Sequence, residues 1–330
     1  MKNREYYLED LKDNEKKLIL ELQELILIES MNFYRGKNIH WLSAPVTTGT
    51  ISSPMGLGSD SSPVKICLDN HETYLADSMQ FLLEYGCRFF NDGCWYIMPT
   101  FRGEDVDKRH LKQFFHSEAE IPGSLNDILN LVDEYIKYLL QKIQVVIGEQ
   151  KHLTQIIKHD IPRITFDEAE KILGKENIEC HETWRNLSSD NEKKLIEHFG
   201  GAVWVMYYDE DAVPFYQRSI NGKAQNADLL MGIGETIGCG ERWANGIELD
   251  KALKHHKIKK TDYEWYVKVK SFQPIQTSGF GMGIERFLLF VLGKNDIRDI
   301  QVFRRFNDGK DIVLNKDLGI TMYVNDFPNL

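Results

Sequence analysis

One stretch of the sequence combines cationic, acidic and aromatic side chains in a spacing that suits a nucleotide. In FRGEDVDKRHLKQFF, Arg102 and Glu104 are two residues apart and therefore share one face of a strand. Arg109 and His110 follow in a connecting loop, and Phe114 lies on the returning strand. Arginine grips phosphate through its forked donors, a carboxylate accepts from an exocyclic amine, and a ring stacks on a base. A solvated hairpin with cross-strand ion pairs would have the same composition, so the stretch alone leaves both interpretations open.

A second stretch, DLLMGIGETIGCGERW, carries two acids that suit a hard metal ion. Asp228 and Glu235 are seven residues apart with glycines between them, as on two strands of a hairpin. Such a hairpin brings both carboxylates near one point, where Mg²⁺ is held by one or two carboxylates together with substrate phosphates. Arg242 follows in the same region. The alternative is a glycine-rich turn with surface acids.

The third stretch, GFGMGIERFLLFVLG, places three alternating glycines and an arginine before an apolar run. It fits neither the dinucleotide glycine pattern nor the phosphate loop. Gly279, Gly281 and Gly283 would let backbone approach a ligand closely, and Arg286 begins a helix whose dipole favours an anion. Alternatively, Arg286 is an ordinary helix-terminal arginine paired with a nearby acid.

The elements that must position these residues alternate along the chain without repeats or low-complexity linkers. Apolar periodicity predicts helices over 8–31, 124–147 (capped by Ser124), 166–173 and 284–292. Strands are predicted over 39–46, 94–104, 111–121, 203–208, 228–232, 234–238 and 263–269, with a loop over 47–62 and a glycine turn before residue 284. Hairpin-linked strands with helices gathered around them indicate one mainly antiparallel α+β domain.

Composition narrows the function classes. With 330 residues, 42% of them apolar, the chain can bury a large core. The sequence contains neither a membrane-spanning apolar run nor an N-terminal signal core, and its five cysteines form no CxxC pair, so we expect a cytoplasmic protein with reduced thiols. The net charge of −10 argues against a nucleic-acid partner, because phosphate binding needs concentrated Lys and Arg.

Taken together and in this order, the three stretches resemble the catalytic core of class II aminoacyl-tRNA synthetases, and within them the asparaginyl and aspartyl subgroup. FRGEDVDKRHLKQFFHSEAEI resembles the second signature of that subgroup, and GFGMGIERFLLFVLGKNDIRDI resembles the third. DLLMGIGETIGCGER is similar to its metal-binding and amino-acid-binding hairpin. The likeness runs from about residue 16 to residue 306. It implies a single α+β domain over residues 1–330, built as an antiparallel sheet flanked by helices.

The resemblance implies roles for individual residues. Arg102 and Arg286 would be the catalytic arginines: Arg102 would grip the α-phosphate of ATP, and Arg286 would reach the γ-phosphate while stacking adenine against Phe114. Glu104 would read the adenine amino group. The other implied ligands are Arg109 and His110 for the terminal phosphates, Asp228 and Glu235 for Mg²⁺ (Glu235 also facing ATP), and Ser78, Gln80, Glu118 and Arg242 for the amino acid.

The implied reaction is attack of a substrate carboxylate on the α-phosphorus of ATP, giving an acyl-adenylate and pyrophosphate. Arginines and Mg²⁺ would neutralise the developing charge. This step needs no general base, because a carboxylate is already ionised at neutral pH.

The acyl acceptor is less well defined, because the chain departs from the subgroup. We expect no anticodon-binding barrel domain before the core, as in the stand-alone asparagine synthetases that are paralogues of the asparaginyl enzyme. Leu83 stands where aspartyl enzymes carry a lysine, whereas Glu118 fits the asparaginyl pattern.

Our leading hypothesis is therefore an ATP-dependent ligase that adenylates aspartate or a related acidic amino acid. The acyl group would pass to ammonia or a small amine, without tRNA and without a membrane. The second hypothesis is an asparaginyl- or aspartyl-tRNA ligase-type enzyme that charges tRNA or modifies a macromolecule. A non-catalytic regulatory paralogue is the third, and the intact ATP ligands argue against it.

The resemblance also implies a homodimer, formed through the first helix and the strand that ends at Pro45. The role of Cys239, in packing or in substrate contact, stays open.

Overall fold

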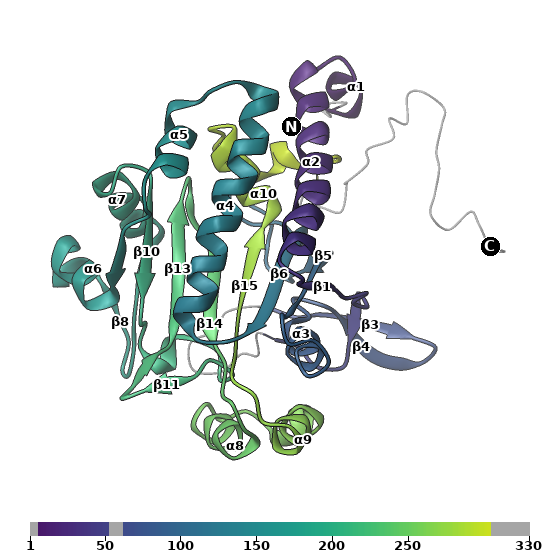
Figure 1. Cartoon of the computed structure of the whole chain (residues 1–330), viewed down its shortest axis with the longest axis vertical. Helices are drawn as coiled ribbons and strands as arrows, with labels where there is room; N and C mark the ends of the chain where they lie inside the picture. Colours follow the sequence, from purple (N-terminus) through teal and green to yellow (C-terminus); the bar gives the residue numbers. More distant parts are fainter. Residues whose placement is uncertain (1–5, 53–61, 305–330) are drawn as a thin grey trace.

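An eight-stranded sheet organises the chain, which the computed structural model describes over residues 6–52 and 62–304 (Figure 1). The strands follow the order β1-β5-β6-β15-β14-β13-β10-β7, and only the two edge pairs, β1 with β5 and β7 with β10, are parallel. Their bounds are β1 His40–Trp41, β5 Cys94–Phe101, β6 Gln113–Pro122, β15 Thr277–Gly283, β14 Gly234–Glu241, β13 Asn226–Met231, β10 Ala202–Met206 and β7 Arg163–Thr165. The prediction of a mainly antiparallel α+β fold is confirmed.

Long helices cover one face of this sheet. In Figure 1, α2 and α4 lie side by side across it, with α10 beside them. The helices on this side are α1 Tyr6–Asp10, α2 Asn14–Gly36, α4 Leu125–Ile147, α5 Lys151–Lys158 and α10 Ile284–Val291. Their apolar side chains, such as Ile26 and Leu139, pack with Ala119, Phe280 and Met282 of the sheet in the main core. Burial of this apolar surface is the chief stabilising term of the domain.

The opposite face of the sheet is only partly covered, and this leaves room for a site. Helices α6 Phe166–Leu173 and α7 Ser189–His198 pack a second core against β10 and β13. Helices α3 Gln80–Gly86, α8 Gly246–His255 and α9 Glu264–Phe272 lie at one end of the sheet. The remaining strands form three small sheets: β2 Thr47–Thr48, β3 Val64–Leu68 and β4 His71–Leu75; β8 Glu179–Cys180 and β9 Arg185–Asn186; β11 Ser219–Ile220 and β12 Lys223–Ala224.

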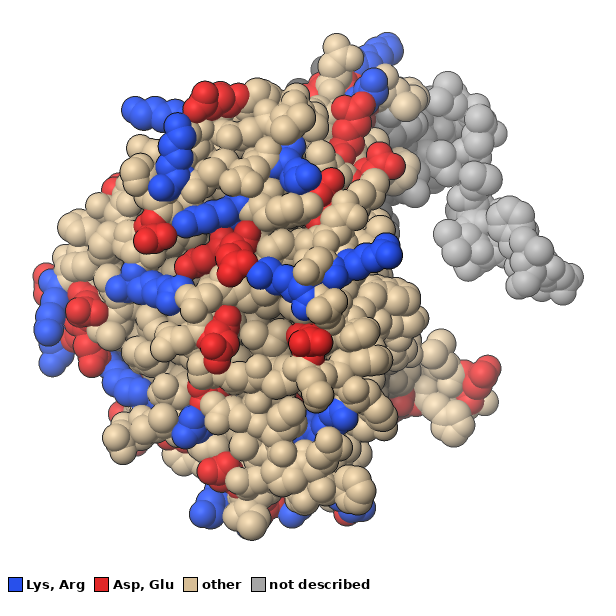
Figure 2. Space-filling model, viewed as in Figure 1, with Lys and Arg blue, Asp and Glu red and all other residues tan. Residues whose placement is uncertain are grey.

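Figure 2 shows the helix-covered face as a mixture of charges. Acidic and basic side chains are interspersed over it, as in the ion pairs of Arg163 with Asp133 and of Lys142 with Glu29. None of the helices in the described ranges combines the length and the hydropathy that crossing a bilayer requires.

Several predicted elements are confirmed nearly to the residue. Helix α6 occupies the predicted 166–173, and α4 follows Ser124, whose side chain forms a capping box with Asp127. The hairpin of β5 and β6 is present, but β5 ends at Phe101, so Arg102 and Glu104 lie just beyond the strand and not within it. The first helix is interrupted after Asp10 and restarts at Asn14.

Three predictions were wrong. The segment 263–269 is helical, not a strand: Tyr263, Tyr266 and Val267 are buried while Trp265 is exposed, which is the i, i+3, i+4 spacing of a helix. The strand predicted over 39–46 is only two residues long. The glycines at 279–283 form strand β15 instead of a turn. Within the predicted loop 47–62, Thr47–Thr48 pairs with β4, and residues 53–61 lie outside the described ranges.

Candidate active site

Strand β6 carries a row of functional side chains on the open face of the sheet. Because side chains alternate along a strand, Phe114, His116, Glu118 and Glu120 share one face, while Ser117 points the other way and contacts Tyr135 of α4. The neighbouring strand β15 presents its alternating glycines to the same face.

Two of these glycines make room for the site. A Cβ atom at Gly279 would lie 1.8 Å from Oε2 of Glu120, so only glycine fits beneath that carboxylate. A Cβ atom at Gly281 would meet no clash, but it would project from the floor of the cavities described next. The glycine spacing therefore provides an open floor, as the sequence suggested.

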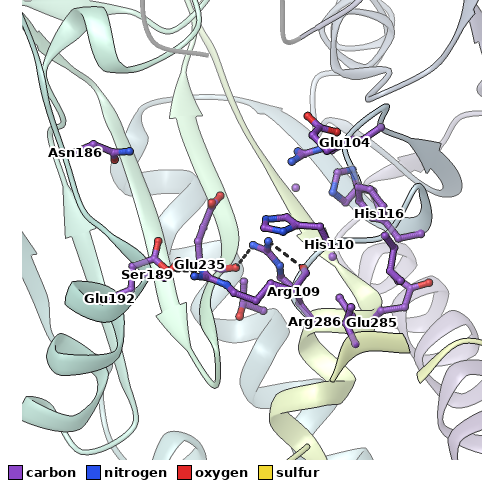
Figure 3. A pocket seen from close by; sticks show the side chains of 17 residues that line it. Glu104, Arg109, His110, His116, Asn186, Ser189, Glu192, Glu235, Glu285 and Arg286 are labelled. Atoms are coloured by element: carbon purple, nitrogen blue, oxygen red, sulfur yellow. Dashed lines mark hydrogen bonds and ion pairs between the residues drawn. The ribbon is translucent and has the colours of Figure 1, made fainter. Parts of the chain in front are cut away.

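A cavity of about 450 Å³ lies over this floor at the end nearest α10 (Figure 3). All seven residues that the resemblance assigned to ATP line it: Arg102, Glu104, Arg109, His110, Phe114, Glu235 and Arg286. They come from the hairpin loop, β6, β14 and α10, and thus from segments more than 180 residues apart. The structure brings this whole set together.

The hairpin end of the cavity has polar atoms that lack protein partners. The guanidinium of Arg102 lies 5.6 Å from the centre of the Phe114 ring, and its buried Nε has no hydrogen-bond partner among the described residues. Glu104 accepts a hydrogen bond from Ser62 N at 2.7 Å through Oε1, whereas its buried Oε2 is without one in the same ranges. Buried polar atoms are normally satisfied, so these two indicate a polar ligand.

Arg286 is held in place by backbone carbonyls. Its Nη1 donates to the carbonyl of Glu235 at 2.5 Å and its Nη2 to that of Arg109 at 3.4 Å (Figure 3). Burial, together with the nearby cations Arg102 and Arg109, lowers the pKa of Arg286. Three neighbouring guanidinium groups suit a multiply charged anion, and Arg286 forms no ion pair with an acid among the described residues.

The two loop residues are less free than the sequence suggested. Arg109 forms a 2.7 Å ion pair with Glu192 of α7, so part of its charge is already compensated. His110 is half exposed and contacts Asp107 at 3.0 Å. Both still line the cavity.

The predicted metal ligands converge on one point. Asp228 lies opposite Gly238 in the β13–β14 hairpin, and a Cβ atom at Gly238 would be 3.2 Å from Glu235 Oε1 and 3.7 Å from Asp228 Oδ1. Burial, and then the charge of Glu235, raises the pKa of Asp228 well above its usual range. Two oxygen ligands that repel each other beside a phosphate-sized cavity fit a divalent cation such as Mg²⁺, which would keep both ionised.

A second cavity of about 440 Å³ adjoins the first. Ser78, Gln80, Glu118 and Arg242, the residues assigned to the amino acid, all line it, as do Asp228 and Glu235. The two cavities share Arg102, Glu104, His110, His116 and Gly281 among their lining residues, so they form one continuous site.

Glu118 is the best-satisfied carboxylate of the second cavity. It accepts hydrogen bonds from Ser78 Oγ at 2.6 Å and Tyr96 OH at 2.5 Å, and it contacts His116 Nδ1 at 2.8 Å. Burial alone would raise its pKa, but the contacts with His116, Ser78 and Tyr96 outweigh burial and hold the pKa below its usual value. Glu118 therefore stays ionised in the cavity, where it can hold an ammonium group.

Arg242 lies at the far end of the second cavity and is already paired. Its Nε and Nη2 donate to Glu120 at 3.2–3.3 Å, and its guanidinium lies 5.3 Å from the Tyr216 ring centre. Leu83 is buried in a small apolar cluster and offers no second cation. Gln80 presents a buried Nε2 that has no partner in the described part of the chain.

Sequence reasoning missed three important residues. His116 and Glu120 could have been found from the alternation that places them on the same face as Phe114 and Glu118. Glu192 gave no signal, because it reaches the site from α7 through tertiary packing alone. Cys239 is buried in the main core and also lines the second cavity, so packing and substrate contact both stay open for it.

Comparisons with known proteins agree with this geometry. The family described as tRNA synthetases class II (D, K and N) matches residues 1–307. The asparagine–tRNA ligase of Psychromonas ingrahamii is 30% identical over 315 residues (83% of this chain and 66% of that protein), and that of Pyrococcus abyssi is 28% identical over 305 residues (87% and 68%). The chain thus spans about two thirds of the length of these relatives.

Solved structures show the same fold. The asparaginyl-tRNA synthetase of Pyrococcus horikoshii complexed with asparaginyl-adenylate superposes with a TM-score of 0.84 at 24% identity, covering 92% of this chain and 71% of that one. The asparaginyl-tRNA synthetase of Entamoeba histolytica gives 0.80 at 22% identity, covering 91% and 70%. With the signature residues gathered around one continuous cavity, these matches show that the chain belongs to the class II tRNA synthetases (D, K and N), a family of ATP-dependent, AMP-forming ligases.

Proposed function

We propose that the protein activates asparagine with ATP, forming asparaginyl-adenylate and pyrophosphate, as an asparaginyl-tRNA ligase-type enzyme. The observation that carries this proposal is the buried Arg242–Glu120 pair at the end of the amino-acid cavity. An aspartate side chain would need an uncompensated cation there, because desolvating a carboxylate is costly. A neutral carboxamide needs only hydrogen bonds, and Nη1 of Arg242 has no hydrogen-bond partner within the described residues.

This proposal replaces our leading sequence-based hypothesis of aspartate activation followed by amide formation. Support comes from the charge balance of the cavity and from the asparagine–tRNA ligases among the relatives. We therefore propose the 3′-terminal hydroxyl of a tRNA as the acyl acceptor in place of ammonia. The helix-covered face of Figure 2 has interspersed charges and offers a polyanion little attraction, so we infer that tRNA approaches the open face.

The proposed roles follow the two cavities. Phe114 and Arg286 would stack adenine, Glu104 would accept from its amino group, and Arg102 would hold the α-phosphate where the two cavities meet. Arg109 and His110 would face the terminal phosphates. Asp228 and Glu235 would hold Mg²⁺, which when bound neutralises phosphate charge.

On the amino-acid side, Glu118, Ser78 and Gln80 would bind the ammonium group, and Arg242 would donate to the side-chain carbonyl. The substrate carboxylate then lies beside Arg102, in line with the bond to pyrophosphate. Positioning two anions against each other is the main task of the site, and the arginines perform it.

A homodimer would also explain an exposed apolar surface. Several large hydrophobic side chains of α2 and β1 remain exposed: Leu20, Leu27, Ile28, Met31 and Trp41. We propose that a second copy of the chain covers them.

Pyrophosphate exchange into ATP tests the proposal. We expect exchange with asparagine and much weaker exchange with aspartate or glutamine, and loss of exchange in Arg102→Ala. Transfer is then measured with an asparagine tRNA transcript and, separately, with ammonia. Exchange with aspartate and not with asparagine, followed by release of asparagine when ammonia is added, would refute the proposal and restore the amide-forming hypothesis.

A further inference from the structure

We propose that His116 is the general base that accepts the proton of the attacking acceptor group in the acyl-transfer step. This inference rests on the proposed function, because it concerns the fate of the adenylate formed there. The adenylation step needs no base, whereas a hydroxyl that attacks an acyl-adenylate must lose its proton.

His116 occupies the middle of the row of side chains that β6 presents to the open face. Residues two apart on a strand face the same way and are about 7 Å apart. His116 therefore lies midway between Phe114, under the base, and Glu118, beside the ammonium group. The acyl–phosphate bond of an adenylate would lie between these two ends. His116 lines both cavities, as Arg102 does.

The ring of His116 lies beside the Glu118 carboxylate. Nδ1 of His116 is 2.8 Å from Oε1 of Glu118, and the side chain is 13% exposed. A carboxylate this close to the ring would stabilise the imidazolium that forms when Nε2 accepts a proton. Nε2 has no hydrogen-bond partner among residues 6–52 and 62–304. Gly283 is opposite His116 in β15, so no side chain from that position covers the ring.

Nε2 accepts the hydroxyl proton while the hydroxyl oxygen forms a bond to the acyl carbon. The bond from that carbon to the phosphate oxygen breaks, and AMP leaves with the electron pair. The imidazolium, held by Glu118, then releases its proton to solvent. A glutamine at position 116 would keep polarity and size but could not accept the proton.

The test separates the two half-reactions in the full-length protein. Pyrophosphate exchange reports adenylation, and single-turnover transfer from preformed asparaginyl-adenylate to the tRNA transcript reports the second step. Because His116 also helps to keep Glu118 ionised, we expect His116→Gln to lower exchange by about tenfold, with Ser78 and Tyr96 still donating to Glu118, while transfer slows by about 100-fold. Hydroxylamine, a neutral nucleophile with a free lone pair, should react equally with both proteins. His159→Gln, an exposed histidine at the end of α5, is the control.

Equal transfer rates in His116→Gln and wild type would overturn the inference, as would equal losses in exchange and transfer, which indicate a structural role. A wild-type protein that forms the adenylate but does not transfer it to the tRNA transcript would also overturn the inference. A wild-type protein without exchange would instead refute the proposed function, which makes the two failures distinguishable.

A separate cluster leads to a second inference: the structure assigns a transition-metal site, of the kind that takes Zn²⁺, to Glu210, His255 and His256. One ligand atom from each lies within 4.8 Å of the others. His256 is 4% exposed, and its ring nitrogens have no hydrogen-bond partner in the described ranges. Two imidazoles and a carboxylate form a common three-ligand set for zinc.

An independent contact supports this assignment. His255 Nε2 lies 2.6 Å from Oδ1 of Asp211, and a carboxylate bound to one ring nitrogen orients a ligating imidazole through the other. The short helix Glu210–Ala212 continues into Val213 and Pro214, which line the amino-acid cavity. A metal here would join this cavity wall to the end of α8.

Zinc titration against a chromophoric chelator tests the site, in a Cys67→Ser/Cys180→Ser background that removes the exposed thiols. We expect one zinc ion per chain with micromolar or tighter affinity, weakened at least about tenfold by His255→Ala and by Glu210→Gln. His198→Ala is the control, because His198 is the last residue of α7 as His255 is of α8. Absence of saturable binding, or equal binding in His255→Ala, would overturn the inference.

Discussion

Glu120 and Arg242 form an ion pair beneath the amino-acid cavity, with Oε2 of the carboxylate 3.2 Å from Nη2 of the guanidinium and both side chains at most 4% exposed. While Glu120 is ionised, the pair presents a donor to the cavity without presenting net charge. If the protein activates asparagine as proposed, we expect its selectivity between a carboxamide and a carboxylate substrate to depend on the charge state of Glu120.

Glu120→Gln should shift selectivity towards aspartate. The substitution keeps the shape of the side chain but leaves Arg242 uncompensated, so a substrate carboxylate gains a cation. We expect the ratio of kcat/KM for aspartate to that for asparagine to rise about tenfold, or about 1.4 kcal/mol, in pyrophosphate exchange.

Glu285→Gln is the matched control, because Glu285 is also a buried acid whose pKa burial raises to about 7, but it lies in the nucleotide cavity and accepts from Phe115 N. It should affect both substrates equally. An unchanged ratio in Glu120→Gln would show that Glu120 does not set the selectivity.

The same pair predicts a pH dependence. Burial raises the pKa of Glu120 to about 7, although Arg242 opposes the shift. Lowering the pH from about 8 to about 6 therefore protonates Glu120 and exposes the charge of Arg242. The aspartate-to-asparagine ratio should rise as the pH falls and be flat in Glu120→Gln. A ratio in wild type that is constant over this range would contradict the prediction.

The fold and most of the site could be predicted from the sequence because they rest on local patterns. Amphipathic spacing predicted α4 and α6, and the alternating glycines predicted a close approach of backbone to a ligand, although they form strand β15 and not the expected turn. The strand prediction for 263–269 was wrong because aromatic residues are typical of strands, whereas the burial of these residues follows the helical period.

Contacts made through tertiary packing could not be predicted in this way. Glu192 reaches Arg109 from α7, and Glu120 neutralises Arg242 across 122 residues of sequence. The second contact is the reason why we propose a substrate with a neutral side chain instead of an acidic one, because the sequence showed the cation without its partner. The residue types in the sequence thus indicated which ligands the site could bind, whereas the net charge at the end of the amino-acid cavity became known only from the packing.

Arg286→Ala should weaken ATP binding. The carbonyls of Glu235 and Arg109 hold the guanidinium in place, so this side chain is already ordered before ATP binds. A desolvated cation over an aromatic base contributes about 2 kcal/mol, and we expect the Kd for ATP to rise about 30-fold in calorimetric titration without amino acid. Arg286→Lys should fall between, because it keeps the charge but loses the planar fork. Arg163→Ala, on the helix-covered face, should bind ATP normally, and equal affinity in Arg286→Ala would exclude a role in ATP binding.

A fully buried ion pair behind the amino-acid cavity should dominate the stability of this region. Lys270 Nζ lies 2.5 Å from Oε2 of Glu84, with both side chains 0% exposed, and it also donates to the carbonyl of Trp243 at 2.7 Å. Lys270→Met removes the cation and leaves the Glu84 carboxylate buried without a charged partner. The hydrogen bond from Tyr266 OH to Oε1 would satisfy only one of its two oxygens. We expect a loss of about 3–5 kcal/mol in the free energy of unfolding, measured by urea denaturation.

The double variant Lys270→Met/Glu84→Gln separates the charge from the packing. If the stranded carboxylate is the cause, removing its charge should recover about half of the loss, because no unpaired ion remains buried. If the double variant is as unstable as Lys270→Met, the lysine stabilises the region through its packing and its bond to Trp243. Pyrophosphate exchange in the folded double variant then reports whether the pair also supports the cavity, since Glu84 lies on α3, whose first residue Gln80 lines the cavity.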